Sequence, residues 1–164
     1  MSPAAPSRDG SAEVALPPQF AFEGTLKADL PYHCGDQLRR VGLRPTRQRL
    51  VLGSLLFSKG GRHVTAEMLY AEATAAREQI SLATVYNTLH QFTDAGLLRQ
   101  IGVDGTRSFF DTNPTTHPHF FAEGEERLFD IPEPGLLIDN LPQPLPGYEI
   151  SRVDVIVHLR RKPG

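Results

Sequence analysis

The chain has 164 residues, of which 40% are apolar and 22% are charged, and its formal net charge is −2. This length and composition suit one ordinary domain or two small ones, and they exclude a chain that is disordered throughout. The near-neutral balance also excludes a uniformly basic nucleic-acid coat protein. The charge is unevenly distributed, because residues 36–112 hold ten Lys and Arg against seven Asp and Glu, whereas residues 113–164 hold five against eight. This asymmetry directs attention to the mildly basic middle of the chain.

Cysteine content and hydropathy indicate the cellular compartment of the protein and its relation to membranes. Cys34 is the only cysteine, so the chain forms no internal disulfide and no zinc cage of four thiolates, and we expect a reducing, cytoplasmic environment. No apolar run approaches the roughly 18 residues of a membrane-spanning helix, and the first residues lack the apolar stretch of a secretory signal. We therefore expect no membrane partner. Residues 1–31 are rich in Pro, Ala, Ser and Gly, which predicts a flexible N-terminal arm.

The spacing of apolar residues predicts four helices in the middle of the chain. Two cover residues 33–41 and 45–58, and two more begin after the N-cap residues Thr65 and Ser81, with Gly96 ending the last one. Two β-rich runs follow over residues 97–103 and 107–111. The Asp104-Gly105 step between them is typical of a β-hairpin.

This order of elements predicts an α+β protein with two parts. Three helices followed by a hairpin indicate an N-terminal winged helix-turn-helix domain over residues 32–113. Strands expected over residues 119–122, 127–131 and 148–160, with a short helix over 135–140, indicate a small α/β dimerisation domain over residues 114–164. So small a sheet leaves an exposed edge, which favours a homodimer. Winged folds also mediate contacts between proteins, so the architecture alone does not establish DNA binding.

The fourth helix carries the candidate contacts to DNA. In a helix-turn-helix unit the second helix enters the major groove and meets base edges with its first turns. The polar residues on these turns are Ser81, Thr84, Tyr86 and Asn87. Asn can pair with adenine and Tyr can pack on a thymine methyl group. The candidates for neutralising phosphates of a double-stranded operator are Arg44, Arg47 and Arg49. The alternative is that these arginines only solvate helix faces.

Three histidines and one carboxylate form the candidate metal site. His117 and His119 are two residues apart, so both fall on one face of an extended segment. With His63 and Asp111 they make a nitrogen and oxygen donor set suited to Zn²⁺, Fe²⁺ or Mn²⁺. An isolated His-x-His pair also arises on ordinary surfaces. A metalloenzyme would use such a site to activate water, but no acid/base, nucleophile or phosphate-loop motif accompanies it, so we expect no enzyme.

Several runs resemble the ferric uptake regulator family over roughly residues 36–131. They are Gly42-Leu-Arg-Pro-Thr-Arg-Gln-Arg, His63-Val-Thr-Ala-Glu-Met-Leu-Tyr, and Ser81-Leu-Ala-Thr-Val-Tyr-Asn-Thr-Leu followed by Asp94-Ala-Gly-Leu-Leu. The resemblance implies a dimeric DNA-binding regulator with a metal site between its halves, at His63, Asp111, His117 and His119. Ala122 and Glu125 stand where many members have a Cys pair, which implies that a structural thiolate zinc site is lost. Thr116 and Pro118 replace a further His and Asp, which implies that a second, regulatory site is lost.

Three other runs resemble the iron response regulator (Irr) branch of that family in alphaproteobacteria. They are Leu55-Leu-Phe-Ser-Lys-Gly, Thr112-Asn-Pro-Thr-Thr-His-Pro-His-Phe-Phe and Gly147-Tyr-Glu-Ile. This resemblance implies a regulator, mainly a repressor, of iron and haem homeostasis that responds to haem. It implicates His117 and His119 in haem binding, with Cys34 as a second candidate, although Gly35 follows Cys34 where the branch has Pro. The alternative is a repressor of the same family that responds to zinc or manganese, or holds a metal structurally.

Overall fold

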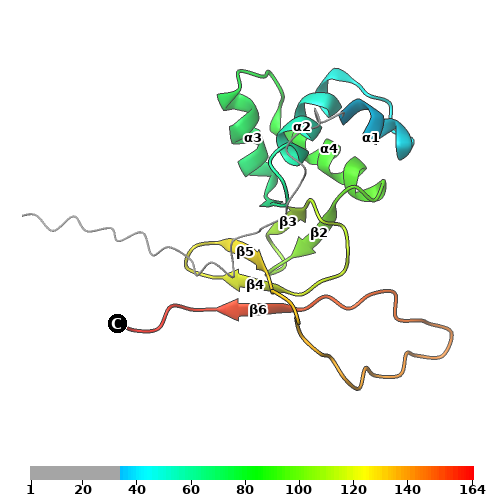
Figure 1. Ribbon diagram of the computed structural model, residues 1–164, viewed down its shortest axis with the longest axis vertical. Helices are drawn as coiled ribbons and strands as arrows, with labels where there is room; N and C mark the ends of the chain where they lie inside the picture. The colour runs from blue at the N-terminus through cyan, green and yellow to red at the C-terminus, as the bar shows by residue number, and fades with distance from the viewer. Residues whose placement is uncertain (1–33) are drawn as a thin grey trace, which may run out of the picture.

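A computed structural model describes residues 34–164, which form a mixed α+β fold (Figure 1). The first half is helical, with α1 (Cys34–Arg40), α2 (Arg47–Phe57), α3 (Ala66–Ala75) and α4 (Leu82–Asp94). The first two helices lie within the ranges that the sequence predicts. The expected arm over residues 1–31 lies outside the described residues. No helix in the described part is long and apolar enough to cross a membrane.

Three of the helices begin at a hydroxyl side chain. Thr46, Thr65 and Ser81 each accept a hydrogen bond from the backbone N–H three residues further on. Such a cap satisfies an N–H group that the first helical turn leaves without a partner, and losing it costs about 1 kcal/mol. The caps at Thr65 and Ser81 are those that the sequence predicts. The second helix begins at Arg47, two residues later than predicted, because Thr46 takes the cap position.

The four helices enclose an apolar core. The side chains with no exposed surface include Leu38 of α1, Leu52 and Leu56 of α2, Leu69 of α3, and Leu89 and Phe92 of α4. Burying one such side chain contributes about 1.5–3 kcal/mol to stability. Because Val85 and Leu89 anchor one face of α4 in this core, the opposite face of α4 is directed to solvent.

The first sheet lies directly beneath the helices (Figure 1). It is antiparallel in the order β1 (His63–Val64), β3 (Ser108–Asp111), β2 (Arg99–Gly102). The hairpin between β2 and β3 is the predicted one. Asp104 accepts hydrogen bonds from the N–H groups of Thr106 and Arg107, and Gly105 has the positive φ of 79° that the turn requires. The short strand β1 is not predicted by the sequence, because two residues are too few to show a period.

The second sheet has the order β5 (Arg127–Asp130), β4 (His119–Ala122), β6 (Ile156–Leu159). β4 pairs antiparallel with β5 and parallel with β6. The two sheets meet through apolar side chains, since Ile101 and Phe109 of the first pack with Phe121 and Leu128 of the second. The rings of Phe109 and Phe121 are 6.1 Å apart. This apolar contact is one of the connections between the two sheets.

Two predictions about the C-terminal part are wrong. Residues 135–140 form no helix, and only Ile156–Leu159 of the strand expected over 148–160 is formed. Prolines at 132, 134, 142, 144 and 146 remove backbone donors from this stretch. Residues 149–154 alternate as a strand does, but no neighbouring strand of the described chain pairs with them. Instead, residues 132–155 leave the second sheet as a long excursion and return to β6 (Figure 1).

Candidate metal centre

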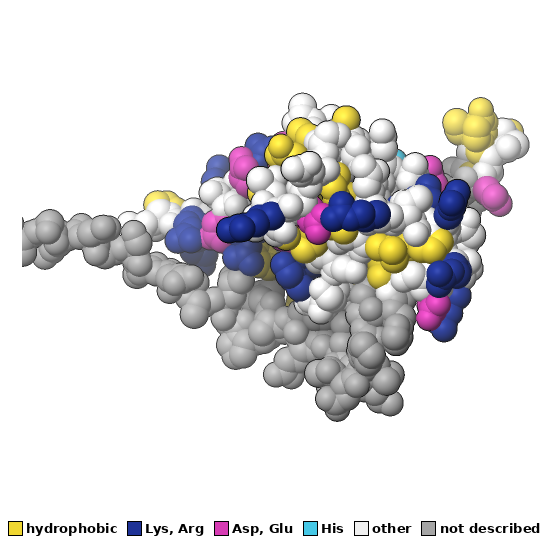
Figure 2. Space-filling model, turned by 90° about the horizontal axis from the view of Figure 1, so that it is seen from above, with side chains coloured by type: hydrophobic (Ala, Val, Ile, Leu, Met, Phe, Trp, Pro, Cys, Tyr) yellow, Lys and Arg dark blue, Asp and Glu magenta, His cyan; other side chains and the backbone are white. Residues whose placement is uncertain are grey.

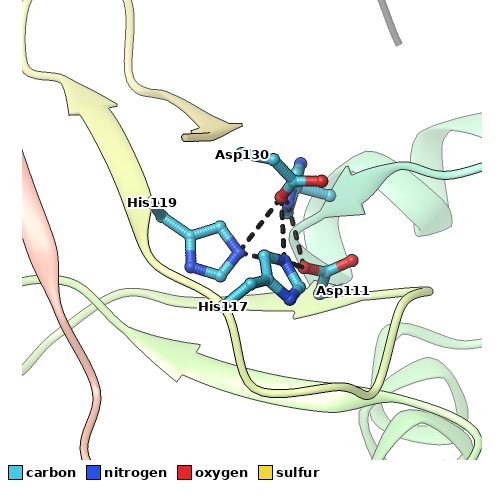
Figure 3. A group of neighbouring side chains, drawn as sticks. Asp111, His117, His119 and Asp130 are labelled. Carbon is cyan, nitrogen blue, oxygen red and sulfur yellow. Dashed lines mark hydrogen bonds and ion pairs between the residues drawn. The ribbon is translucent and has the colours of Figure 1, made fainter. Parts of the chain in front are cut away.

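Five side chains converge where the two sheets meet. The atoms that could bind a metal on His63, Asp111, His117, His119 and Asp130 all lie within 4.8 Å of one another. Figure 3 shows His117, His119 and the two carboxylates pointing toward one another from separate segments. The Asp111 and His119 side chains are almost completely buried. The cluster therefore links the first sheet, through His63 and Asp111, to the second sheet.

Strand register explains how these residues come together. His63 of β1 lies directly opposite Asp111 of β3, and His119 of β4 lies directly opposite Asp130 of β5. Residues opposite each other in an antiparallel ladder point to the same face, so each histidine meets its own aspartate. His117 precedes β4 by two residues and joins the same group.

Each imidazole contacts both carboxylates. Asp111 Oδ2 lies 3.0, 2.9 and 3.0 Å from the Nε2 atoms of His63, His117 and His119. Asp130 Oδ1 lies 2.9, 2.9 and 3.3 Å from the same three atoms. Metal–ligand bonds of about 2.1 Å at right angles place neighbouring donors about 3 Å apart. Three imidazoles and two carboxylates at these spacings fit a divalent transition metal.

The charges of the cluster are strongly coupled. Burial alone would lower the pKa of His63, but hydrogen bonds to Asp111 and Asp130 outweigh it and raise this pKa to about 9. The same opposition of burial and hydrogen bonds raises the pKa of His119. Burial would raise the pKa of Asp111, yet its bonds to His119 and His63 lower it to about 2, and the pKa of Asp130 is lowered for the same reasons. A bound cation would replace the imidazole protons as the positive charge facing these carboxylates.

The structure brings together all four residues of the predicted set and adds a fifth. His63, Asp111, His117 and His119 are those that the sequence analysis names, and Asp130 is the one it misses. A signal for Asp130 exists in the two strands predicted over residues 119–122 and 127–131, because strands so close in sequence can pair with each other. If 122 pairs with 127, as it does, then 119 must face 130.

The expected haem ligands lie in two separate places. Cys34 is 5% exposed in the helical core, and a Cβ on Gly53 would approach its sulfur to 2.4 Å. This close packing of the thiol lends no support to a haem ligand at Cys34, whose role in haem binding stays a prediction. His117 and His119 direct their Nε2 atoms at the carboxylates. This arrangement suits a metal ion, and haem binding by these two histidines stays a prediction.

The sequence has a clear relationship to known proteins. The family model described as "Ferric uptake regulator family" matches residues 40–144. The chain belongs to the ferric uptake regulator family. It is 31% identical to the peroxide-responsive repressor PerR of Staphylococcus aureus over 115 residues, which cover 70% of this chain and 77% of that protein. Members of the family are transcriptional regulators and not enzymes.

Solved structures of ferric uptake regulators share the fold. That of Pseudomonas aeruginosa with manganese matches with a TM-score of 0.61 and 24% identity, over 80% of this chain and all of that one. That of Francisella tularensis with iron matches with a TM-score of 0.59 and 16% identity, over 74% and 93% of the two chains. At these identities the likeness concerns the fold, and the arguments about the site remain those of its geometry.

In this member of the ferric uptake regulator family, the outer face of α4 presents polar side chains. Tyr86 is 38% exposed, and Asn87 is exposed beside it. The Tyr86 hydroxyl donates to Glu67 of α3 at 2.5 Å, which holds the ring in one orientation. Thr84 is half-buried, and its hydroxyl accepts a hydrogen bond from the Ser81 hydroxyl at the helix cap.

The three predicted phosphate contacts surround the start of α2. Arg44 is exposed, Arg47 pairs with Glu78 at 2.8 Å, and Arg49 donates to Gln91 of α4 at 3.1 Å. Figure 2, which views the molecule from the helical end, shows Lys and Arg side chains on this end with acidic side chains between them. Arg49 is therefore tied to α4, while the other two extend from the surface.

Proposed function

We propose that this protein is a metal-responsive transcriptional regulator, mainly a repressor, in which a bound metal ion controls binding to an operator. The observation that carries the proposal is the five-residue cluster where the two sheets meet. An ion held there would bond to β1 and β3 on one side and to β4 and β5 on the other. Metal occupancy would thereby decide how rigidly the two sheets are joined.

The ion fits the residues present. Three imidazoles and two carboxylates suit Zn²⁺, Fe²⁺ or Mn²⁺, which accept mixed nitrogen and oxygen donors. The ion would supply positive charge that neutralises Asp111 and Asp130. The protein's own contribution is the strand register that sets His63 opposite Asp111 and His119 opposite Asp130.

For the DNA contact we propose that α2 to α4 with the β2–β3 hairpin act as a winged helix-turn-helix. α4 would enter the major groove, where Tyr86 and Asn87 are exposed on its first turns. Ser81 and Thr84 at its N-terminus would lie beside the backbone of the duplex. Arg44, Arg47 and Arg49 would neutralise phosphates. We propose that the protein acts in the cytoplasm, since its single cysteine suits a reducing environment.

We propose a homodimer formed by the C-terminal part. Between residues 132 and 150 an unusual number of large apolar side chains are exposed, namely Leu136, Leu137, Ile138, Leu141, Leu145, Tyr148 and Ile150. This stretch carries three acidic residues and no Lys or Arg. One face of the second sheet offers a complementary surface, an apolar pocket of about 200 Å³ lined by Phe120, Phe129 and Leu159 beside Arg160 and Arg161. A second copy of the chain would cover both.

Dimerisation would connect the metal to DNA recognition. Two α4 helices reading a palindromic operator must be separated by about one helical turn of DNA, or 34 Å. An ion that fixes the first sheet against the second fixes each α4 relative to the dimer interface. Metal binding would therefore select the separation that matches the operator.

Iron and haem homeostasis is the process we propose for this regulation, on the resemblance to the Irr branch. The effector we favour is the metal ion, because the packed cluster suits an ion and Cys34 lies in the core. Haem is the second candidate, supported by the same resemblance alone. The metal ion and haem would exclude each other, because haem bound at His117 or His119 would expel a metal ion from the cluster.

The test is operator binding by the metal-free protein with Zn²⁺, Mn²⁺, Fe²⁺ or haem added, at one fixed salt concentration. We expect at least one ion to change the operator affinity and the His63→Ala, His119→Ala double variant to lose that change. A matched control is His158→Ala, whose ring lies beside Glu123 outside the cluster. A stoichiometric Soret band with haem, together with indifference to every metal, would replace the metal by haem as effector.

A further inference from the structure

A buried arginine lies next to the metal centre without belonging to it. Arg99 begins β2 and is 7% exposed. Its guanidinium group donates to the carbonyl oxygen of Thr115 at 3.0 Å and binds the carboxylate of Asp154. A buried guanidinium needs such partners, because leaving its charge unpaired is costly. Arg99 thus joins β2 to the connection before β4 and to the segment before β6.

The Thr115 carbonyl is shared with a residue of the cluster. Nδ1 of His117 lies 2.8 Å from this oxygen. A carbonyl oxygen can only accept, so Nδ1 must carry the proton of this hydrogen bond. In a neutral imidazole the other nitrogen, Nε2, is then unprotonated, and it is Nε2 that faces Asp111 and Asp130. The carbonyl therefore sets both the orientation and the tautomer that metal binding needs.

The connection between Asp111 and His117 is also held by hydrogen bonds between Thr112 and Arg62 and by bonds within itself. The Asn113 N–H donates to Asp111 Oδ1 at 2.8 Å, which leaves Oδ2 of Asp111 facing the imidazoles. The Asn113 side chain accepts from the N–H and the hydroxyl of Thr115. Arg99 adds a bond from a neighbouring strand, and this bond ends on the carbonyl that holds His117.

Asp154 fixes Arg99 from the side of the C-terminal strand. It precedes Val155, whose carbonyl oxygen accepts from the His119 N–H at 3.1 Å. It also binds Arg152 Nε at 2.9 Å, and its side chain is 37% exposed. The segment before β6 therefore touches two of the candidate ligands, one through Arg99 and Thr115 and one through the backbone.

We propose that Arg99 is a positioning residue of the metal centre, which acts on His117 through the Thr115 carbonyl and is itself held by Asp154. The proposal rests on the proposed metal-binding function. Loss of an outer-shell partner typically lowers metal affinity about 10–100-fold. We expect Arg99→Gln to weaken binding within that range. Arg99→Lys keeps the positive charge but lacks the several N–H donors with which a guanidinium group bonds two partners. Its loss of metal affinity should therefore be smaller than that of Arg99→Gln.

The experiment is a titration of the metal-free protein with Co²⁺, whose absorption in the visible range reports both affinity and coordination. Each variant is titrated alone and combined with His117→Ala. If Arg99 acts through His117, Arg99→Gln weakens Co²⁺ binding in the native background and adds no further loss once His117 is absent. Equal losses in both backgrounds would overturn the proposal, because a general structural effect is independent of His117.

Two further variants guard against simple unfolding. Asp154→Asn leaves Arg99 in place and changes a partly exposed side chain, so it should fold and still weaken Co²⁺ binding. Arg152→Gln is the matched control, because Arg152 binds the same carboxylate and has no bond to Thr115 in the structure. It should bind Co²⁺ as the native chain does. Normal affinity in both Arg99→Gln and Asp154→Asn would disprove the positioning role.

A nuclear magnetic resonance measurement on the Zn²⁺-loaded protein gives a separate readout. Long-range proton–nitrogen spectra should show His117 protonated at Nδ1, with the exchange of that proton accelerated in Asp154→Asn. An unaltered exchange rate would contradict the inference. If the native chain binds neither Co²⁺ nor Zn²⁺, the proposed function itself fails. If it binds them and all variants match it, only the role of Arg99 fails.

Discussion

His119 and Asp130 face each other across the β4–β5 ladder, and Asp130 Oδ1 contacts the Nε2 atoms of all three clustered histidines. Asp111 does the same from β3. The two carboxylates therefore have equivalent roles although one comes from each sheet. A metal ion bound between them would be held by the first sheet and the second sheet together.

Asp130→Asn tests this equivalence. The change keeps the size of the side chain and removes its negative charge, so metal binding should weaken by more than the 10–100-fold typical of an outer-shell loss. Competition with a chromophoric chelator for Zn²⁺ measures the affinity. Asp139→Asn is a suitable control, since Asp139 is exposed and lies outside the cluster. An affinity equal to that of the native chain would show that Asp130 is not a ligand.

Local patterns predict the first half of the fold well because each element there is specified by its own residues. Caps at Thr65 and Ser81 and the Asp104-Gly105 turn act over a few positions, and periodicity places the helices. The C-terminal part differs, because pairing decides whether a strand forms. Residues 149–154 have the alternation of a strand, but no neighbouring strand in the described chain pairs with them.

The residues of the candidate site likewise divide into those that a local sequence pattern reveals and those that depend on strand pairing. The two histidines of His117-Pro-His119 are visible as a local pattern, and His63 and Asp111 come from the family resemblance as well as from their residue types. Asp130 depends on register, a relationship between two strands that no single segment displays. The role of Arg99 is still harder to predict from the sequence, because it depends on two partners that lie 16 and 55 residues away along the chain.

The stability of the metal-free protein should fall as the pH rises above neutrality. The pKa of His63 is about 9 in the folded state, against about 6.5 in an unfolded chain. Its charged contacts therefore contribute fully below pH 6.5 and are lost as the pH rises through 9. Asp111, whose pKa is lowered to about 2, contributes above its unfolded value near 3.8. Maximum stability is thus expected between about pH 4 and pH 6.5.

Saturating Zn²⁺ should reverse this trend above pH 6.5. Metal binding releases the His63 proton, so the affinity for Zn²⁺ rises with pH up to about 9. The stabilisation of the folded protein by Zn²⁺ therefore also increases with pH. Thermal unfolding from pH 6 to pH 9, with and without Zn²⁺, measures both slopes. His63→Gln should flatten the metal-free curve. Parallel curves for the two forms would mean that the ion does not compete with this proton.

Tyr86→Ala should greatly reduce operator affinity while leaving the fold and the dimer intact. Tyr86 is exposed on α4 and is held by Glu67, so removing the ring deletes a surface contact rather than a core one. Fluorescence anisotropy with operator and unrelated duplexes measures the change. The matched variant Tyr86→Phe keeps the ring and separates packing on bases from the hydroxyl bond. If Tyr86→Ala bound the operator with native affinity, α4 would not be the helix that contacts the bases.

Arg44→Gln should weaken operator and unrelated duplexes alike. A phosphate contact carries no sequence information, so its loss lowers the salt dependence of binding by about one unit of slope. Binding measured over a range of salt concentrations gives that slope. Lys162→Gln is the comparison, because Lys162 is exposed beyond the end of β6 and lies outside the helical half of the chain. A change in sequence preference with an unaltered slope would instead indicate that Arg44 reads a base.

Leu137→Glu tests the proposed dimer surface. Leu137 is 91% exposed, so the substitution removes no buried contact from a single chain and should leave its thermal unfolding close to native when monomeric. In a dimer that buries the 132–150 stretch, the new carboxylate would be desolvated without a partner, which opposes association. Sedimentation should therefore show dissociation at concentrations where the native chain is dimeric. Arg127→Gln, on the exposed rim of the second sheet, should weaken association less. A native dimer that tolerates Leu137→Glu would place the interface elsewhere.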